Sequence, residues 1–225
     1  MKKISLAIFI LALTIGLIFS ANCGLNGINN ITGIKGSGTA KTETRTIAGF
    51  KKIEASGAVN LEVDAQKDFN VTVEADDNLL QHIKTEVSGD TLKIYSEGRI
   101  SPTTKLNVKI SMPEIAGLNV SGASDAKIMN VKTDSLELKA SGASEITLNG
   151  EAKELNADAS GASEINAENL KVENADVEAS GASSADVSAT NELNVEASGA
   201  SKISYSGEPK NLKQNASGAS SINKK

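Results

Sequence analysis

The side chains best suited to chemistry in this chain are one histidine, one cysteine and a regular series of carboxylates. A Ser-His-Asp triad would depend on His82 alone, because the chain has no other histidine. The same count excludes metal sites built from clusters of His and Cys. We interpret His82 as a surface or packing residue, and we expect no catalytic residue, no metal site and no cofactor.

Three carboxylates recur at the same place in a repeat. Asp125, Glu145 and Glu164 each follow a copy of the tetrapeptide Ser-Gly-Ala-Ser, so they would form an acidic column if the copies stack. Paired carboxylates can hydrolyse glycosides, and stacked ones can bind cations. The next three copies end the column, because they place there Ser184, Lys202 and Ser221. We interpret the column as a solvated face, with weak cation binding and catalysis as the alternatives.

Cys23 is the only cysteine, and it follows a segment typical of a secretory signal. Lys2 and Lys3 precede an apolar run over residues 4–19, and small residues follow this run. The run is shorter than the roughly 20 residues that a membrane span prefers. A retained membrane anchor is therefore the less favoured interpretation.

The position of Cys23 resembles a bacterial lipobox, in which the cysteine is acylated and becomes the new N-terminus. Ser20 and Asn22 depart from the residues usual in that motif. The alternatives are an incidental thiol and cleavage by an ordinary signal peptidase after Ala21 or Ser20. A lipidated Cys23 would attach the mature protein to the membrane without spanning it.

These signals predict the organisation of the chain. We expect a signal peptide at residues 1–22 and, at residues 23–41, the lipidated cysteine and a flexible tether rich in Gly, Asn, Thr and Ser. Two further parts follow: a less regular strand-rich part at residues 42–118 and a regular solenoid at residues 119–225. Without residues 1–22 the chain has 21 basic and 28 acidic side chains, and a net charge of −7 disfavours nucleic acid as a partner.

The Ser-Gly-Ala-Ser repeat determines the expected architecture. Six copies follow one another at spacings of 18 to 20 residues, with their glycines at Gly122, Gly142, Gly161, Gly181, Gly199 and Gly218. Apolar residues alternate with polar ones on both sides of each copy, which is the pattern of strands with one buried face. We therefore predict an all-β fold, a right-handed parallel β-helix or β-solenoid with coils of about 19 residues.

The tetrapeptide itself suits a crowded corner of each coil. Glycine there admits a positive φ or a close approach of two backbones. If the alternation continues through the corner, the second serine of each copy points inward, and the serines stack as a ladder of hydroxyls. These serines are Ser124, Ser144, Ser163, Ser183, Ser201 and Ser220.

The part before the repeats has strands but a weaker pattern. It contains one divergent relative of the repeat at residues 56–59 and one candidate for a short helical turn, carrying Leu79, Leu80 and Ile83. We expect Asp76 or Asp77 to cap that turn.

Few features of the chain suggest a binding cleft. The loop over residues 97–105 is the best candidate for a binding feature, and an ordinary connection is its alternative. The coil spacing leaves no room for long loops, and only four aromatic residues follow the signal segment: Phe50, Phe69, Tyr95 and Tyr205. Both facts argue against a polysaccharide-active enzyme.

Four stretches carry a family resemblance. They are residues 48–57, residues 74–80, residues 89–94 and the serial Ser-Gly-Ala-Ser blocks. Together they resemble the putative auto-transporter adhesin, head GIN domain family, over roughly residues 42–222. The resemblance implies a β-helical fold in envelope-associated bacterial proteins, many of them lipoproteins, and it brings no catalytic residues.

We therefore expect a non-enzymatic surface lipoprotein, secreted across the inner membrane and held in the cell envelope. Gly24, which follows the cysteine, is not the aspartate that retains some lipoproteins in the inner membrane, so the outer membrane is favoured. The expected partners are the membrane, through Cys23, and an extracellular protein or glycan. A polysaccharide-active β-helix enzyme and a purely structural envelope protein remain the alternatives.

Overall fold

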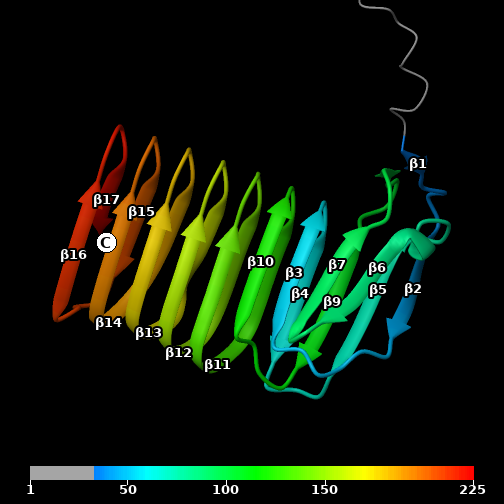
Figure 1. The fold of residues 1–225 in the computed structure, drawn as a ribbon, viewed down its shortest axis with the longest axis horizontal. Helices are drawn as coiled ribbons and strands as arrows, with labels where there is room; N and C mark the ends of the chain where they lie inside the picture. The colour runs from blue at the N-terminus through cyan, green and yellow to red at the C-terminus, as the bar shows by residue number, and fades with distance from the viewer. Residues whose placement is uncertain (1–32) are drawn as a thin grey trace, which may run out of the picture. The chain divides into compact units, whose positions relative to one another are not determined.

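The computed structural model describes residues 33–225, so the predicted signal peptide and Cys23 lie outside the described range. Residues 34–225 form one compact unit (Figure 1). The regular elements of this unit are strands and one 3₁₀ turn, Leu80–His82. The prediction of an all-β solenoid is confirmed.

Ten strands form the N-terminal half of the unit. They are β1 (Ile34–Lys35), β2 (Ala40–Arg45), β3 (Lys52–Gly57), β4 (Asn60–Ala65), β5 (Asn70–Asp76), β6 (Ile83–Ser88), β7 (Thr91–Ser96), β8 (Ile100–Ser101), β9 (Asn107–Met112) and β10 (Gly117–Gly122).

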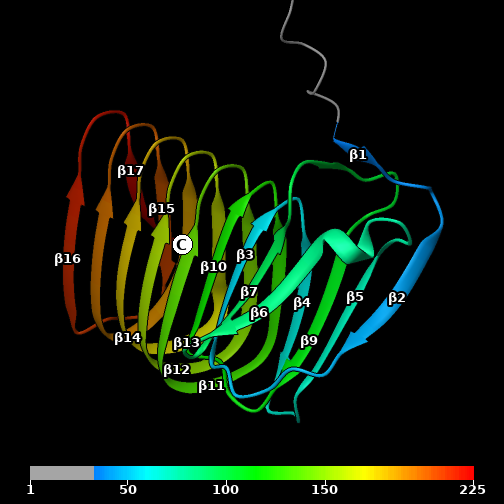
Figure 2. The same cartoon turned by 45° about the vertical axis from the view of Figure 1, so that its right-hand side comes forward.

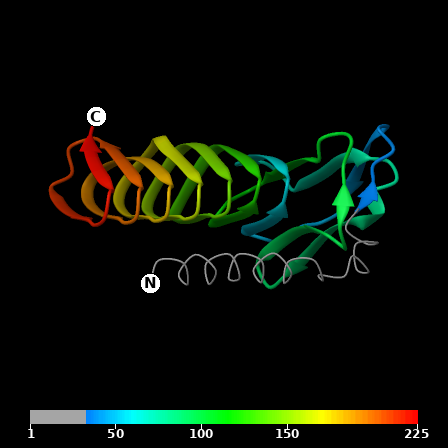
Figure 3. The same cartoon turned by 90° about the horizontal axis from the view of Figure 1, so that it is seen from above.

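Seven strands form the coils that follow, and four of them are long. They are β11 (Asp125–Ala140), β12 (Glu145–Ala159), β13 (Glu164–Ala179), β14 (Ser184–Ala197), β15 (Lys202–Ser206), β16 (Asn211–Ala216) and β17 (Ser221–Lys224). Seen from above, these coils follow one another along the unit (Figure 3).

Each long strand bends and contributes to two layers. In β11, Ala126 pairs with Leu61 of β4, whereas Leu138 pairs with Leu118 of β10. We call the strand segments before each Ser-Gly-Ala-Ser corner the upstream layer and those after it the downstream layer. The strands within the coils pair in parallel, and the corners join the two layers.

Inward side chains of successive coils stack between the two layers. Ala126, Ile146, Ile165, Ala185 and Ile203 occupy equivalent register positions, and each is at most 2% exposed. Alternate residues along each strand face outward, because successive side chains of a strand point to opposite faces. The alternation in the sequence therefore becomes one apolar core with a polar surface on both sides.

The N-terminal half continues the same two layers. Strand β10 pairs residue for residue with β3, from Gly117 and Lys52 to Gly122 and Gly57, so residues 56–59 form a corner like the later ones. Antiparallel strands then close the stack: β6 pairs with β7, and β5 pairs with both β9 and β2 (Figure 2). The division predicted at residue 118 is no structural boundary, because β10 crosses it and pairs on both sides.

The end of the predicted tether also needs correction. Strand β1 and the beginning of β2 lie within residues 34–41, pairing with β8 and β5. Composition suggested flexibility there, but backbone pairing with distant strands orders this segment. Such pairing leaves no periodic signal when the strands are short or exposed on both faces.

The corner glycines lie where the chain passes from the upstream to the downstream layer. The φ values of Gly122, Gly142, Gly161, Gly181, Gly199 and Gly218 lie between +73° and +91°. A Cβ on any of them would lie only 2.3–2.9 Å from the carbonyl oxygen of the glycine one coil earlier. The N–H of the following alanine donates to that same oxygen at 2.7–2.8 Å. A side chain at this position would therefore strain the backbone and separate the coils.

The second serine of the repeat points inward, as predicted. Five of these serines are 2–3% exposed, and Ser220 in the last coil is half-buried. They do not form the predicted ladder of hydroxyls. Instead, the Ser163 hydroxyl lies 2.8 Å from the carbonyl of Ser160 in its own corner and 3.0 Å from that of Ala140 one coil earlier. Carbonyl oxygens lie within reach on both sides, so each hydroxyl links two backbones rather than another hydroxyl.

The prediction that Asp76 or Asp77 caps a helical turn is wrong. Leu80–His82 forms a 3₁₀ turn without a side-chain cap. The fully buried Asp76 carboxylate instead accepts hydrogen bonds from the backbone N–H groups of Gly38, Thr103 and Thr104 at 2.7, 2.8 and 3.1 Å. It thus holds the segment after β1 to the loop after β8.

Candidate functional surface

The side chains considered for chemistry do not come together in one site. His82 is half-buried in the 3₁₀ turn. Asp125, Glu145 and Glu164 do stack in register on the outer face of the downstream layer, and Ser184 continues their row. Within residues 33–225 no group of three or more His, Cys, Asp or Glu side chains is arranged to hold a metal ion.

The loop over residues 97–105 is ordered by the rest of the fold. It contains β8, which pairs with β1, and its Thr103 and Thr104 N–H groups donate to Asp76. The Thr103 hydroxyl also donates to the carbonyl of Gly36 at 2.9 Å. These contacts explain why the loop has its shape without assigning it a ligand.

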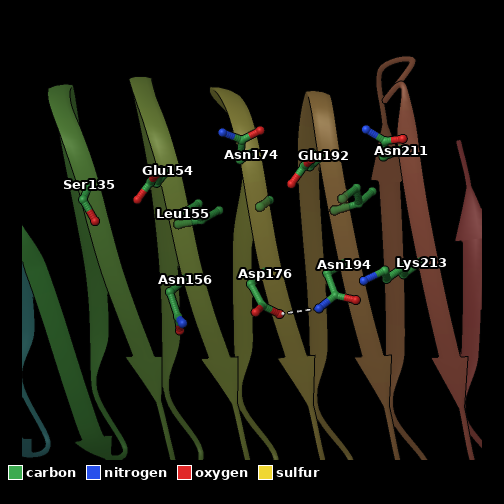
Figure 4. A pocket seen from close by; sticks show the side chains of 12 residues that line it. Ser135, Glu154, Leu155, Asn156, Asn174, Asp176, Glu192, Asn194, Asn211 and Lys213 are labelled. Atoms are coloured by element: carbon green, nitrogen blue, oxygen red, sulfur yellow. Dashed lines mark hydrogen bonds between the residues drawn. The ribbon is translucent and has the colours of Figure 1, made fainter.

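A groove of about 700 Å³ lies over the upstream layer. Strands β11, β12, β13, β14 and β16 line it, so its side chains recur at the spacing of the coils (Figure 4). The polar lining residues are Ser135, Glu154, Asn156, Asn174, Asp176, Glu192, Asn194, Asn211 and Lys213. Aromatic residues are absent from the lining of this groove, so it offers hydrogen-bonding groups and charge rather than a stacking platform.

The lining residues form rows across the strands. Glu154, Asn174 and Glu192 are paired in register, and so are Asn156, Asp176 and Asn194 in the next row. A third row beside the groove has three consecutive carboxylates, which are Asp158, Glu178 and Glu196. We call these nine residues of β12, β13 and β14 the acidic face.

The carboxylates of the acidic face lack lysine or arginine partners within the described residues. Neighbouring strands lie about 4.8 Å apart, and at such distances two like charges repel by about 1 kcal/mol in bulk water. Within the described residues, the one hydrogen bond to a carboxylate of the acidic face is long: the Asn194 side-chain amide donates to the Asp176 carboxylate at 3.5 Å. The acidic face therefore carries charge that the fold itself does not neutralise.

Glu137 marks where this pattern ends toward the N-terminal half. It pairs with Asn156 in register, but Lys139 and Lys52 contact its carboxylate at 2.8 and 3.1 Å. Hydrogen bonds from Lys139 and Lys52 lower the pKa of Glu137 below its ordinary value. The strands that follow also carry lysines, but Lys153 of β12 and Lys171 of β13 pair with Asp134 and Glu151 rather than with the acidic face.

Sequence reasoning identified the Asp125 column but missed the acidic face. A signal was present, because counting back from each corner glycine aligns Asp158, Glu178 and Glu196 at the same distance from it. Rows closer to the bend are harder to align, since the register shifts there between β13 and β14.

Residues 49–209 match the model of the putative auto-transporter adhesin, head GIN domain family. The chain belongs to this family. The resemblance predicted from the sequence is confirmed, and membership suggests an adhesin-like, non-enzymatic role at the surface or envelope. None of the curated proteins matches the chain.

Solved structures show the same fold. A putative adhesin from Bacteroides fragilis is 20% identical with a TM-score of 0.72, covering 85% of this chain and all of that one. A putative adhesin from Parabacteroides merdae is 17% identical with a TM-score of 0.53, covering 86% and 99%. A protein named as a putative lipid binding protein from Parabacteroides distasonis is 22% identical with a TM-score of 0.50, covering 85% and 98%. At these identities the likeness concerns the fold.

The parts of the chain that bear on location lie mostly outside the described range. Cys23 and the predicted signal peptide are among residues 1–32. Across residues 33–225, no helix is long and apolar enough to cross a membrane.

Proposed function

We propose that this protein is an extracytoplasmic lipoprotein, attached to the membrane through Cys23, that presents its solenoid surface to a protein or glycan partner. Its role would be that of an adhesin-like or scaffold module. The observation that carries the proposal is the acidic face, an ordered array of hydrogen-bonding and charged groups whose carboxylates have no lysine or arginine partner within the described residues. Because backbone ladders hold the array rigid, binding would cost little conformational entropy.

The uniform coils support a non-enzymatic role. Corners recur every 18 to 20 residues, so long loops that could enclose a substrate do not interrupt the described coils. Adhesion needs no such enclosure, because repeated weak contacts on an open face add through multivalency. Release of reducing sugar or unsaturated uronate from a polysaccharide would overturn this part of the proposal.

Partner binding can be tested with two matched triple variants. Glu154→Gln, Asp176→Asn and Glu192→Gln remove the three charges of the acidic face that line the groove, whereas Asp125→Asn, Glu145→Gln and Glu164→Gln remove the same number of charges from the opposite layer. Wild-type protein and both variants are applied to arrays of glycans and matrix proteins. We expect the first variant to lose the binding that wild type shows and the control to retain it. Equal binding by all three proteins, or no binding by wild type on broad arrays, would contradict the proposal.

Anchoring is tested separately by mass spectrometry of the mature N-terminus. We expect an acylated Cys23 at the first position and a soluble, unacylated product from Cys23→Ser. An unmodified N-terminus at or before Cys23 would contradict the lipoprotein assignment. Fractionation of the envelope then shows whether the acylated protein resides in the outer membrane.

A further inference from the structure

The chain enters the described unit along an edge formed by β1 and the segment around β8. The Ile34 N–H donates to the carbonyl of Arg99, and the Gly36 N–H to that of Ser101, both at 2.9 Å. Ile34 is 43% exposed, one of three large exposed apolar side chains within residues 33–225. This edge lies at the opposite end of the unit from β16 and β17 (Figure 1).

Three cations lie in the segments that form this edge: Lys35 in β1, Arg99 just before β8 and Lys105 in the loop after β8. All three are exposed, and none forms an ion pair with a carboxylate within residues 33–225. Residues 1–32 contain no Asp or Glu that could neutralise them. The edge therefore combines an exposed apolar residue with free positive charge.

The acidic side chains of the same segments are already engaged. Asp76 is buried beneath three backbone N–H groups, and Asp77 accepts a hydrogen bond from the Ser37 hydroxyl. Glu97 pairs with Lys84 at 3.0 Å. The Asp76 contacts also hold β1 and the loop together, so Ile34 and the three cations belong to one ordered edge.

The charge distribution favours one orientation near an anionic surface. Residues 33–118 have 11 basic and 12 acidic side chains, whereas residues 119–225 have 10 basic and 16 acidic ones. Anionic lipid attracts basic groups within a Debye length and repels acidic ones. The coils, with the acidic face, would be driven away from such a surface, and the β1 edge would be turned toward it.

We propose that the β1 edge rests on the anionic lipid surface into which the acyl chains of Cys23 insert, an inference that depends on the proposed lipoprotein function. Nine residues separate Cys23 from Gly33, so the anchor lies at most about 35 Å from Gly33. This short connection keeps the edge at high local concentration near the lipid, where weak contacts suffice. Ile34 enters the interface, Lys35, Arg99 and Lys105 contact phosphate groups, and the acidic face is held outward.

Single tryptophans can test this orientation, because the chain contains none. Ile34→Trp and Leu212→Trp place the probe at matched residues, 43% and 40% exposed, at opposite ends of the unit. The acylated proteins are reconstituted in phosphatidylcholine vesicles that contain phosphatidylglycerol and brominated lipid. We expect Ile34→Trp to lose most of its fluorescence by quenching and Leu212→Trp to keep it. Equal quenching of the two, or quenching of neither, would overturn the proposal.

Charge reversal tests the basis of the contact. Lys35→Glu, Arg99→Glu and Lys105→Glu, combined with Ile34→Trp, should remove the quenching, as should high salt, while mass spectrometry still finds an acylated Cys23. Persistent quenching would overturn the electrostatic assignment.

Lipid contact by the β1 edge can be tested separately from the anchor. If Cys23 proves to be unmodified, the lipoprotein function fails, and the soluble chain still tests the edge by flotation with anionic and neutral vesicles. Binding to anionic vesicles that the charge reversal abolishes would support the edge as a lipid-binding surface. Absence of binding would overturn it.

Discussion

The coils from β10 to β14 and the segment from β1 to β9 share two layers, but different contacts hold them. In the coils the same corner, the same inward serine and the same backbone ladder recur. In the N-terminal segment each contact occurs only once. The ring centroids of Phe50 and Phe69 lie 5.0 Å apart, and the Asp76 carboxylate holds two loops together. A substitution in a coil should therefore lower the stability of the whole cooperative stack. A substitution in the N-terminal segment should instead promote local unfolding.

The largest expected effect distinguishes two corners of the stack. Gly142→Ala forces a Cβ to within 2.5 Å of the Gly122 carbonyl oxygen, whereas a Cβ on Gly57 would meet nothing within 4 Å. Both glycines have positive φ, so each substitution introduces backbone strain of about 1 kcal/mol. We expect a loss of about 3 kcal/mol for Gly142→Ala and about 1 kcal/mol for Gly57→Ala, measured by urea denaturation. Equal losses would show that coil contact at the corner contributes little.

A smaller effect is expected at the inward serines. Ser163→Ala removes a buried hydroxyl that contacts carbonyls of two coils, and we expect a cost of about 1 kcal/mol in unfolding free energy. Ser220→Ala is the control, because its hydroxyl makes the same kinds of contact from a half-buried position in the last coil. In thermal denaturation, Ser163→Ala should have a lower melting temperature than Ser220→Ala. The opposite order would contradict a role for burial in these links.

The smallest global effect is expected at Asp76, where the change should be local. Asp76→Asn replaces a carboxylate that accepts three N–H bonds, so the amide protons of Gly38, Thr103 and Thr104 should exchange with solvent faster. Asp77→Asn serves as the exposed control. Hydrogen exchange measured by NMR should leave the amides of the coils unchanged, and a uniform acceleration would contradict the contrast between the two regions.

The same contact predicts a dependence on pH. Burial by itself would raise the pKa of Asp76, but hydrogen bonds from the backbone N–H groups of Thr104, Thr103 and Gly38 hold it below its ordinary value of 3.8. A lowered folded-state pKa contributes stability above the unfolded value, and that stability is lost as the pH falls below 3.8. In wild type, the protection factors of the three amides, taken relative to the intrinsic exchange rate at each pH, should therefore fall below this pH, while Asp76→Asn should lack that step.

Much of the coil half could be predicted, because its signals are local. Alternation identified Leu136, Leu138 and Ala140 as inward residues, and the glycine spacing indicated the corners. The role of Asp76 could not be predicted, since its partners lie 27 to 38 residues away and leave no periodic trace. The acidic face was missed for a related reason: its rows exist only when strands are aligned in register.

By itself the sequence determined the repeating coil of this protein, because side-chain alternation and the steric needs of glycine act within a few residues. Tertiary structure alone decided that β3 and β4 belong to the same stack, that antiparallel strands close it, and that unneutralised carboxylates gather on β12, β13 and β14. Those outcomes depend on register between strands distant in the chain. Pairing energies that fix such register are shared among many backbone groups, so no single residue reveals them.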